Sequence, residues 1–288
     1  MPIKLENISY TYAQGSPFAV HALKDISLEL SAGEYVGLVG APGSGKSALL
    51  RLMAGLITPD GGQLFIDGEA ADAKKPAKSA RAELFGRVAL LPEGAEESLF
   101  ETTVYRELAF SLRGRGLSRE DISARAREAL MAVGMDYDAL CGASPFALPL
   151  AARRRLALAC ALMPSPEYLL LDEPLKGLDA PARRELMDIF DGLNARGMGI
   201  VLASAECDDI AERAGRVLVM CRGALIRDGS ARGVFSDYYD LVRHGVAVPH
   251  VKAASQLLRE RGMDMPANVV RYDEFIDRLK IIMWRKGL

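Results

Sequence analysis

The chain has 288 residues, of which 50% are hydrophobic, and a formal net charge of −2 at pH 7. This length accommodates one large α/β domain with, at most, a small appendix. The charge balance argues against a general nucleic-acid binder, which usually carries a basic excess. The N-terminal residues lack a signal-peptide pattern, and no apolar run approaches the roughly 20 residues that a membrane-spanning helix needs. We therefore expect a protein that is soluble by itself and reaches a membrane only by docking.

Short apolar strands alternate with loops and helices in the first third of the chain. In order, the pattern predicts strands over 3–10, 22–30 and 35–39, a helix over 48–56, a strand over 63–68, a solvated loop over 70–82 and a buried strand over 87–91. Four cysteines, with neither metal-site nor disulfide spacing, are typical of a reducing compartment: Cys141, Cys160, Cys207 and Cys221.

The rest of the chain is mainly helical. The pattern predicts helices from 101 to about 135, then helix, strand, helix and strand from 150 to 205, a strand pair around 216–229, and helices to the end with breaks at Pro249 and Pro266. Strands that alternate with helices predict a parallel sheet with both faces covered.

A phosphate-binding loop follows the third predicted strand. The stretch GAPGSGKS fits the pattern G-x-x-x-x-G-K-[ST] and leads into a predicted helix, which is the context this motif requires. Its glycines let backbone N–H groups turn inward, Lys46 supplies a positive charge for phosphates, and Ser47 offers a hydroxyl to Mg²⁺. The alternative, a glycine-rich turn with a stray lysine, does not explain that order of elements. The predicted ATP-binding residues here are Gly40, Ala41, Pro42, Gly43, Ser44, Gly45, Lys46, Ser47 and Ala48.

Two carboxylates end the apolar strand at 168–171. In a protein with a phosphate loop, Asp172 would hold Mg²⁺ together with Ser47, and Glu173 would be the catalytic residue that polarises the attacking water. The alternative is a pair of strand-end acids that cap the following turn. The sequence Gly-Leu-Asp at 177–179 favours the catalytic interpretation.

At these residues the chain resembles the ATP-binding subunits of ABC transporters, and most of all those of energy-coupling-factor importers for vitamins and for cobalt or nickel. The resemblance covers nearly the whole chain. It rests on the segments 5–12, 22–27, 40–47, 171–174, 177–179, 216–220, 228–229, 245–249 and 261–266 and on Gly223.

The resemblance implies an α/β P-loop NTPase with a mixed, mostly parallel sheet. Residues 1–235 would form the ABC-type ATP-binding domain, with a helical subdomain at about 100–160, and residues 236–288 a small helical C-terminal appendix. Binding of ATP and Mg²⁺ would close a dimer with a second ATP-binding subunit, identical or different. That closure would drive a transmembrane importer subunit from the cytoplasmic face of the membrane. Tyr12 would stack on adenine, or else is a packed strand tyrosine.

Three family positions depart from the expected pattern. The signature loop, usually Leu-Ser-Gly-Gly-Gln, reads Leu-Pro-Leu-Ala-Ala at 148–152, so that Pro149, Leu150 and Ala151 stand at its degenerate positions. The glutamine expected after the strand at 87–91 is Glu93, an additional candidate Mg²⁺ ligand that would otherwise repel phosphate. The expected histidine is Ala205.

These departures bear on catalysis more than on binding. Loss of one preorganised donor at developing charge typically lowers a rate by about 10²–10³. We therefore expect an ABC-type ATPase whose hydrolysis is weak in isolation and which forms an asymmetric dimer. The alternatives are a catalytically weak regulatory subunit paired with an active ATPase subunit, and a soluble ABC ATPase without a membrane partner.

Three charged or amphipathic stretches have no assigned role. The acidic residues Glu93, Glu96, Glu97 and Glu101 form either a dock for basic helices of a membrane subunit or a solvated loop. The arginines at 153–155 stand near a helix start, where the helix dipole disfavours cations. They would face phosphates or partner acids, or else solvent. The tail has an amphipathic face, which more often packs on its own domain or on a twin chain than on a membrane.

Overall fold

The computed structural model describes residues 2–66, 68–70 and 86–285. Most of the loop predicted over 70–82, and Asp67 of the strand predicted over 63–68, lie outside these ranges. The strands form two sheets. The first contains β1 (Ile3–Tyr12), β2 (Val20–Leu30), β4 (Gly61–Ile66) and β5 (Glu69–Ala70). The second contains β3 (Tyr35–Val39), β6 (Val88–Leu91), β7 (Tyr168–Asp172), β8 (Gly199–Ser204), β9 (Arg216–Cys221) and β10 (Ala224–Gly229).

The second sheet is mostly parallel, as the sequence predicts. Its strand order is β10-β9-β3-β8-β7-β6, and only the β9–β10 pair is antiparallel. The first sheet, in the order β2-β1-β4-β5, is antiparallel and was not expected as a separate layer. A short connection without a helix joins β1 to β2, and such a connection can pair strands only in the antiparallel sense.

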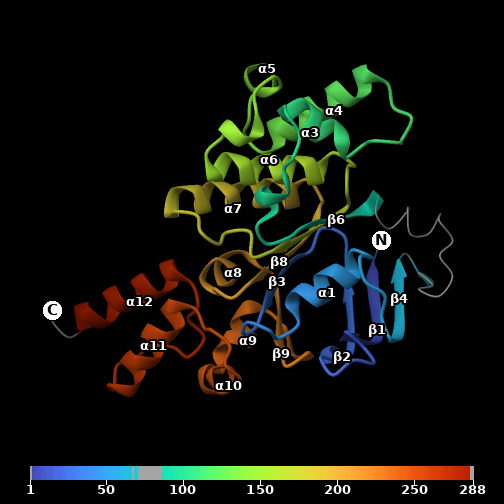
Figure 1. Cartoon of the computed structure of the whole chain (residues 1–288). Helices are drawn as coiled ribbons and strands as arrows, with labels where there is room; N and C mark the ends of the chain where they lie inside the picture. Colours follow the sequence, from blue (N-terminus) through green and yellow to red (C-terminus); the bar gives the residue numbers. More distant parts are fainter. Residues whose placement is uncertain (1, 67, 71–85, 286–288) are drawn as a thin grey trace.

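Helices cover these sheets from several sides (Figure 1). A helical subdomain contains α3 (Val104–Phe110), α4 (Arg119–Ala132), α5 (Tyr137–Leu140) and α6 (Leu150–Leu162), together with the 3₁₀ turns η1 (Ala95–Ser98) and η2 (Pro145–Ala147). The other helices are α1 (Lys46–Met53), α7 (Ala180–Ala195), α8 (Asp208–Arg213), α9 (Ala231–Ser236), α10 (Tyr238–Arg243), α11 (His250–Glu260) and α12 (Tyr272–Arg285). None of the helices within the described ranges is long and apolar enough to cross a bilayer.

Helix α1 packs between the two sheets and thereby positions the loop before it. Leu49 and Leu50 of α1 share one core cluster with Ile26 of the antiparallel sheet and with Leu38 and Leu170 of the parallel sheet. Leu169 and Leu171 of β7 belong instead to the core on the opposite face. Successive side chains of a strand point to opposite faces. The alternation therefore turns Asp172 toward α1.

A buried ion pair connects the helical subdomain to the parallel sheet. Arg154 of α6 donates to Glu96 of η1, with Nε 2.9 Å from Oε2, and both side chains are at most 7% exposed. The same guanidinium donates to the carbonyl oxygens of Pro174 and Lys176, which follow β7. The predictions for both residues were wrong. Glu96 is buried and is neither solvated nor available for docking. Arg154 contacts an acid of its own chain, and not solvent, phosphate or a partner.

The C-terminal helices contact the rest of the chain at their start. Leu241, Val246 and Val270 belong to the main core, whereas Met265, Val269 and Ile282 form a small cluster of their own. Figure 1 shows α11 and α12 side by side at the end of the molecule that carries the C-terminus. Helix α11 begins directly after Pro249, and Pro266 lies between α11 and α12, so both predicted helix breaks are confirmed. The boundary at 236 stays a prediction.

We expect Arg154→Met to lower the free energy of unfolding by about 3–5 kcal/mol, because it leaves the Glu96 carboxylate buried without a partner. Denaturant titration followed by circular dichroism measures this change. Arg155→Met is the matched control. Arg155 reaches the largely exposed Glu185 at 3.6 Å, and its loss should change stability by about 0–1 kcal/mol. Equal effects of the two variants would contradict the prediction.

Candidate nucleotide-binding site

The phosphate loop is held tightly by its neighbours. It connects β3 to α1, and its Gly45 has a φ of 108°, in the left-handed region that favours glycine. A Cβ atom at Gly45 would lie 2.5 Å from the carbonyl oxygen of Ala22, and one at Gly40 would lie 2.4 Å from that of Met220. The N–H group of Gly223, in the β9–β10 turn, donates to the loop carbonyl of Ser44 at 2.9 Å. The loop therefore has little freedom to change shape.

Lys46 lies at the centre of this loop. Its ammonium donates to the carbonyl oxygen of Gly40 at 2.8 Å and stands 3.9 Å from Oε1 of Glu173. Desolvation lowers the pKa of Lys46, and the nearby Glu173 and Asp172 carboxylates partly offset that effect. A buried cation that lines an open cleft is suited to receive the negative charge of phosphates.

Asp172 ends β7 with an unused acceptor. Its side chain is 4% exposed, and its Oδ1 atom has no hydrogen-bond partner. A buried carboxylate oxygen without a hydrogen-bond donor is energetically costly, and a cation or a cation-bound water would stabilise it. Within the described residues no three His, Cys, Asp or Glu side chains gather as a metal site. This donor set fits Mg²⁺, which is usually held by one or two protein oxygens together with waters and substrate phosphates.

Glu173 is aimed into the site by an unusual backbone conformation. Its φ of 48° is left-handed, which a residue with a Cβ rarely adopts, and its N–H donates to the carbonyl oxygen of Ala203 at 2.9 Å. Such strain is concentrated at functional sites. Burial raises the pKa of Glu173, although Lys46 and hydrogen bonds from Ala205 and Ser204 oppose the rise. A higher pKa makes this carboxylate a better proton acceptor near neutral pH.

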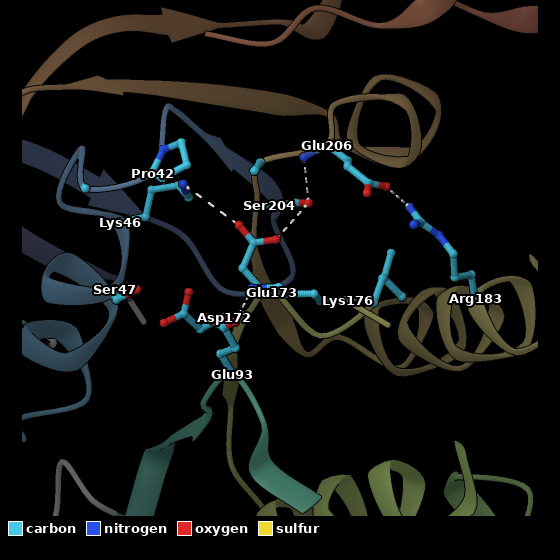
Figure 2. A pocket seen from close by; sticks show the side chains of 13 residues that line it. Pro42, Lys46, Ser47, Glu93, Asp172, Glu173, Lys176, Arg183, Ser204 and Glu206 are labelled. Carbon is cyan, nitrogen blue, oxygen red and sulfur yellow. Dashed lines mark hydrogen bonds and ion pairs between the residues drawn. The ribbon is translucent and has the colours of Figure 1, made fainter. Parts of the chain in front are cut away.

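A cleft of about 300 Å³ brings eight of the predicted residues together. Figure 2 shows Lys46 and Ser47 on one wall, with Asp172 and Glu173 facing them. Pro42, Gly43, Glu93 and Ala205 also line this cleft. The acids therefore lie opposite the phosphate loop, as the sequence predicts; their roles stay predictions.

Several residues of the cleft were missed by the sequence reasoning. They are Leu175, Lys176, Arg183, Ser204 and Glu206. Ser204 donates to Oε2 of Glu173 at 3.3 Å, and Lys176 lies with its Nζ atom 2.6 Å from Oε1 of Glu93. Ser204 ends β8, which lies next to β7. A polar residue at the end of that neighbouring strand is the sequence feature that could have indicated its place in the site. Nothing in the sequence indicates the pairing of Lys176 with Glu93.

Several predicted residues are absent from the described cleft lining: Gly40, Ala41, Ser44, Gly45 and Ala48 of the phosphate loop and its helix, Tyr12, and the signature segment. Tyr12, at the end of β1, packs edge-on against Tyr10 with ring centroids 4.9 Å apart, and its hydroxyl accepts from Arg51 at 3.4 Å. It does not line the cleft, so its contact with adenine stays a prediction. The signature segment also contributes no residue to the described cleft lining. Pro149 caps the start of α6 without a side-chain hydrogen bond, and Leu150 is partly exposed there.

A phosphate loop that faces strand-end acids across a parallel sheet, beside an antiparallel sheet and a helical subdomain, defines an ATPase of the ABC class. The family model described as ABC transporter matches residues 23–176. The energy-coupling factor transporter ATP-binding protein EcfA2 of Symbiobacterium thermophilum is 39% identical, and the alignment covers 100% of this chain and 99% of that protein. Its namesake from Streptococcus pneumoniae is 38% identical over 97% of this chain and 99% of that protein. The chain therefore belongs to the energy-coupling factor transporter ATP-binding proteins of the ABC transporter family.

Solved structures agree with this assignment. The structure of cbiO1 from Clostridium perfringens, described as part of the ABC transporter complex cbiONQ, has a TM-score of 0.73 and 25% identity, covering 88% of this chain and 98% of that one. A dimeric post-hydrolysis state of the ATP-binding cassette MJ0796, bound to ADP and Pi, has a TM-score of 0.69 and 25% identity, covering 80% and 99%.

We expect Gly45→Ala to lower the affinity for MgATP by at least about tenfold, because its Cβ would displace the loop from Ala22 and misplace its N–H groups. Isothermal titration calorimetry measures the change. Gly197→Ala is the control: Gly197 also has a positive φ, of 95°, but lies in open space between α7 and β8. It should affect stability by about 1 kcal/mol and leave nucleotide affinity unchanged. Unaltered MgATP binding by the Gly45 variant would contradict the prediction.

Proposed function

We propose that this chain is the ATP-binding subunit of an energy-coupling-factor importer, in which ATP-driven closure of a dimer of ATP-binding subunits moves the membrane subunits. The observation that carries the ATP-binding part is the approach of Lys46 to Glu173, 3.9 Å apart across a cleft that also contains the unpaired Asp172 oxygen. The relatives' names support the importer part, because the similarity covers the whole chain.

The main residues of the proposed site have distinct tasks. The loop N–H groups and Lys46 hold the phosphates of ATP. Ser47 and Asp172 hold Mg²⁺, which neutralises phosphate charge when bound. Glu173 accepts the proton of the attacking water, and Ser204 keeps its carboxylate in position by a hydrogen bond. Tyr12 receives the adenine at the end of β1.

The cleft of one chain needs a second chain to be complete. The segment 148–152 begins α6 in the helical subdomain and does not line its own cleft. In a head-to-tail dimer it would instead cover the cleft of the partner, as the similarity to dimeric cassettes supports. There Pro149 has neither a hydroxyl nor an N–H group to offer, and Leu150 carries a bulky side chain in place of glycine. A partner with an intact signature would complete the cleft of this chain.

The proposed docking site for a membrane subunit lies on the segment that follows β6. Phe100 and Phe110 pack edge to face with centroids 4.8 Å apart, yet both are largely exposed. Glu97, on the segment between β6 and Phe100, is exposed as well. An exposed apolar pair with an exposed acid on the adjoining segment is suited to a partner with basic and apolar side chains. We infer that a transmembrane subunit docks here and holds the chain peripherally at the cytoplasmic face.

We expect slow phosphate release by the purified chain alone, and an increase of at least about tenfold when a family subunit with an intact signature is added, because one preorganised donor is worth about 10²–10³ in rate. A coupled phosphate assay measures both rates. Glu173→Gln in this chain, mixed with the same partner, controls for hydrolysis at the partner's own site. Brisk hydrolysis by the chain alone that disappears in Glu173→Gln would contradict the division of labour.

The raised pKa of Glu173 predicts a pH profile for that assembly. The carboxylate is active only when deprotonated, so kcat/KM should fall as the pH drops through its pKa, with a midpoint above the ordinary 4.5 of a glutamate. Ser204→Ala removes a hydrogen bond that favours the charged form, and should move the midpoint further upward. A midpoint at or below 4.5, or a downward shift in the Ser204 variant, would contradict the assignment.

A further inference from the structure

Glu93 and Lys176 meet in the cleft although 83 positions separate them in the sequence. Nζ of Lys176 lies 2.6 Å from Oε1 of Glu93, and the two side chains are 67% and 50% exposed. Exposed ion pairs contribute at most about 1 kcal/mol. A stronger anion that enters the cleft can therefore replace Glu93 as the partner of Lys176.

The other two cations among the described residues of the cleft are held more firmly. Lys46 is buried against the carbonyl oxygen of Gly40. Arg183 contacts Glu206 at 2.5 Å and Asp209 at 2.8 Å. In the described part of the chain, Glu93 is the one acid that Lys176 contacts, and it stands in the same cleft as the predicted phosphate site. Lys176 is thus the cleft cation with the greatest freedom to turn toward a ligand.

The backbone of Lys176 is fixed beside the proposed general base. Its N–H donates to the carbonyl oxygen of Glu173 at 3.2 Å, and its own carbonyl oxygen accepts from the buried Arg154. A flexible, charged side chain therefore stands on an anchored backbone. Figure 2 shows Lys176 beside Glu173, across the cleft from Lys46.

We propose that Lys176 is a binding residue for the γ-phosphate of ATP, which it contacts after release from Glu93. Glu93 is then the counter-ion of the nucleotide-free cleft and not a Mg²⁺ ligand. The family resemblance leads one to expect a histidine where this chain has Ala205. The exchange would compensate for its absence, because it places one cation beside the terminal phosphate. This inference rests on the proposed ATP binding and adds a specific residue to it.

The test compares a nucleotide with a γ-phosphate and one without. Isothermal titration calorimetry would measure the affinities of the full-length chain, of Lys176→Met and of Lys176→Arg for MgADP and for the magnesium complex of the non-hydrolysable β,γ-imido analogue of ATP. We expect Lys176→Met to lose about tenfold in affinity for the imido analogue, as for one hydrogen bond to a charged group. Its affinity for MgADP should stay within about twofold, and Lys176→Arg should retain most of the discrimination. Equal losses for both nucleotides, or no loss for either, would overturn the proposal.

The variant Glu93→Gln provides an independent test of the exchange. If Glu93 competes with phosphate for Lys176, its neutralisation should raise the affinity for the imido analogue by about threefold to tenfold, because an exposed pair of about 1 kcal/mol no longer has to be broken. A fall in affinity that higher Mg²⁺ concentrations restore would instead make Glu93 a metal ligand and overturn the exchange. Absence of binding to either nucleotide by the unmodified chain would refute the proposed ATP binding itself, an outcome distinct from both results.

Discussion

The parallel pairing of β3, β8 and β7 is the constraint on which the site depends. Parallel strands bring their carboxyl ends to one edge of the sheet, so the loop after β3 and the acids after β7 meet there with only β8 between them. Helix α1, packed between the two sheets, holds the loop at that edge, and the resulting distance from Lys46 to Glu173 is 3.9 Å. Neither side chain could reach the other if the strand order placed β7 farther from β3.

Arg154 extends this arrangement into the helical subdomain. Its guanidinium joins Glu96, in the segment that follows β6, to two carbonyl oxygens directly after the strand-end acids of β7. A buried pair of this kind favours one geometry, because any shift of η1 relative to α6 would leave a charge unpaired. The proposed docking face and the proposed nucleotide site therefore share a rigid connection, which suits a subunit that converts closure around ATP into movement of a membrane partner.

The chain keeps the groups proposed to bind ATP and departs from the expected family pattern at positions proposed to act in a closed dimer. The phosphate loop, Asp172 and Glu173 lie together in one cleft, whereas Pro149 and Leu150 lie on α6 and outside it. Binding and closure can therefore persist while hydrolysis depends on what a second chain supplies. The Glu93–Lys176 pair modifies the same cleft from within, because each side chain neutralises the other until, as proposed, Lys176 turns to the γ-phosphate.

The sequence by itself determined the phosphate loop, the strand before it, the strand-end acids and the mostly parallel sheet. These features are local: glycines at fixed offsets and the alternation of apolar residues act over a few positions. The tertiary structure alone decided that the first strands form a separate antiparallel sheet, that Arg154 is buried against Glu96 58 positions away, and that Lys176 meets Glu93. The spacing of charged residues along the sequence does not indicate which residues they pair with. Their pairing follows from how distant elements pack, and the lost solvation of a buried charge then requires a partner within reach.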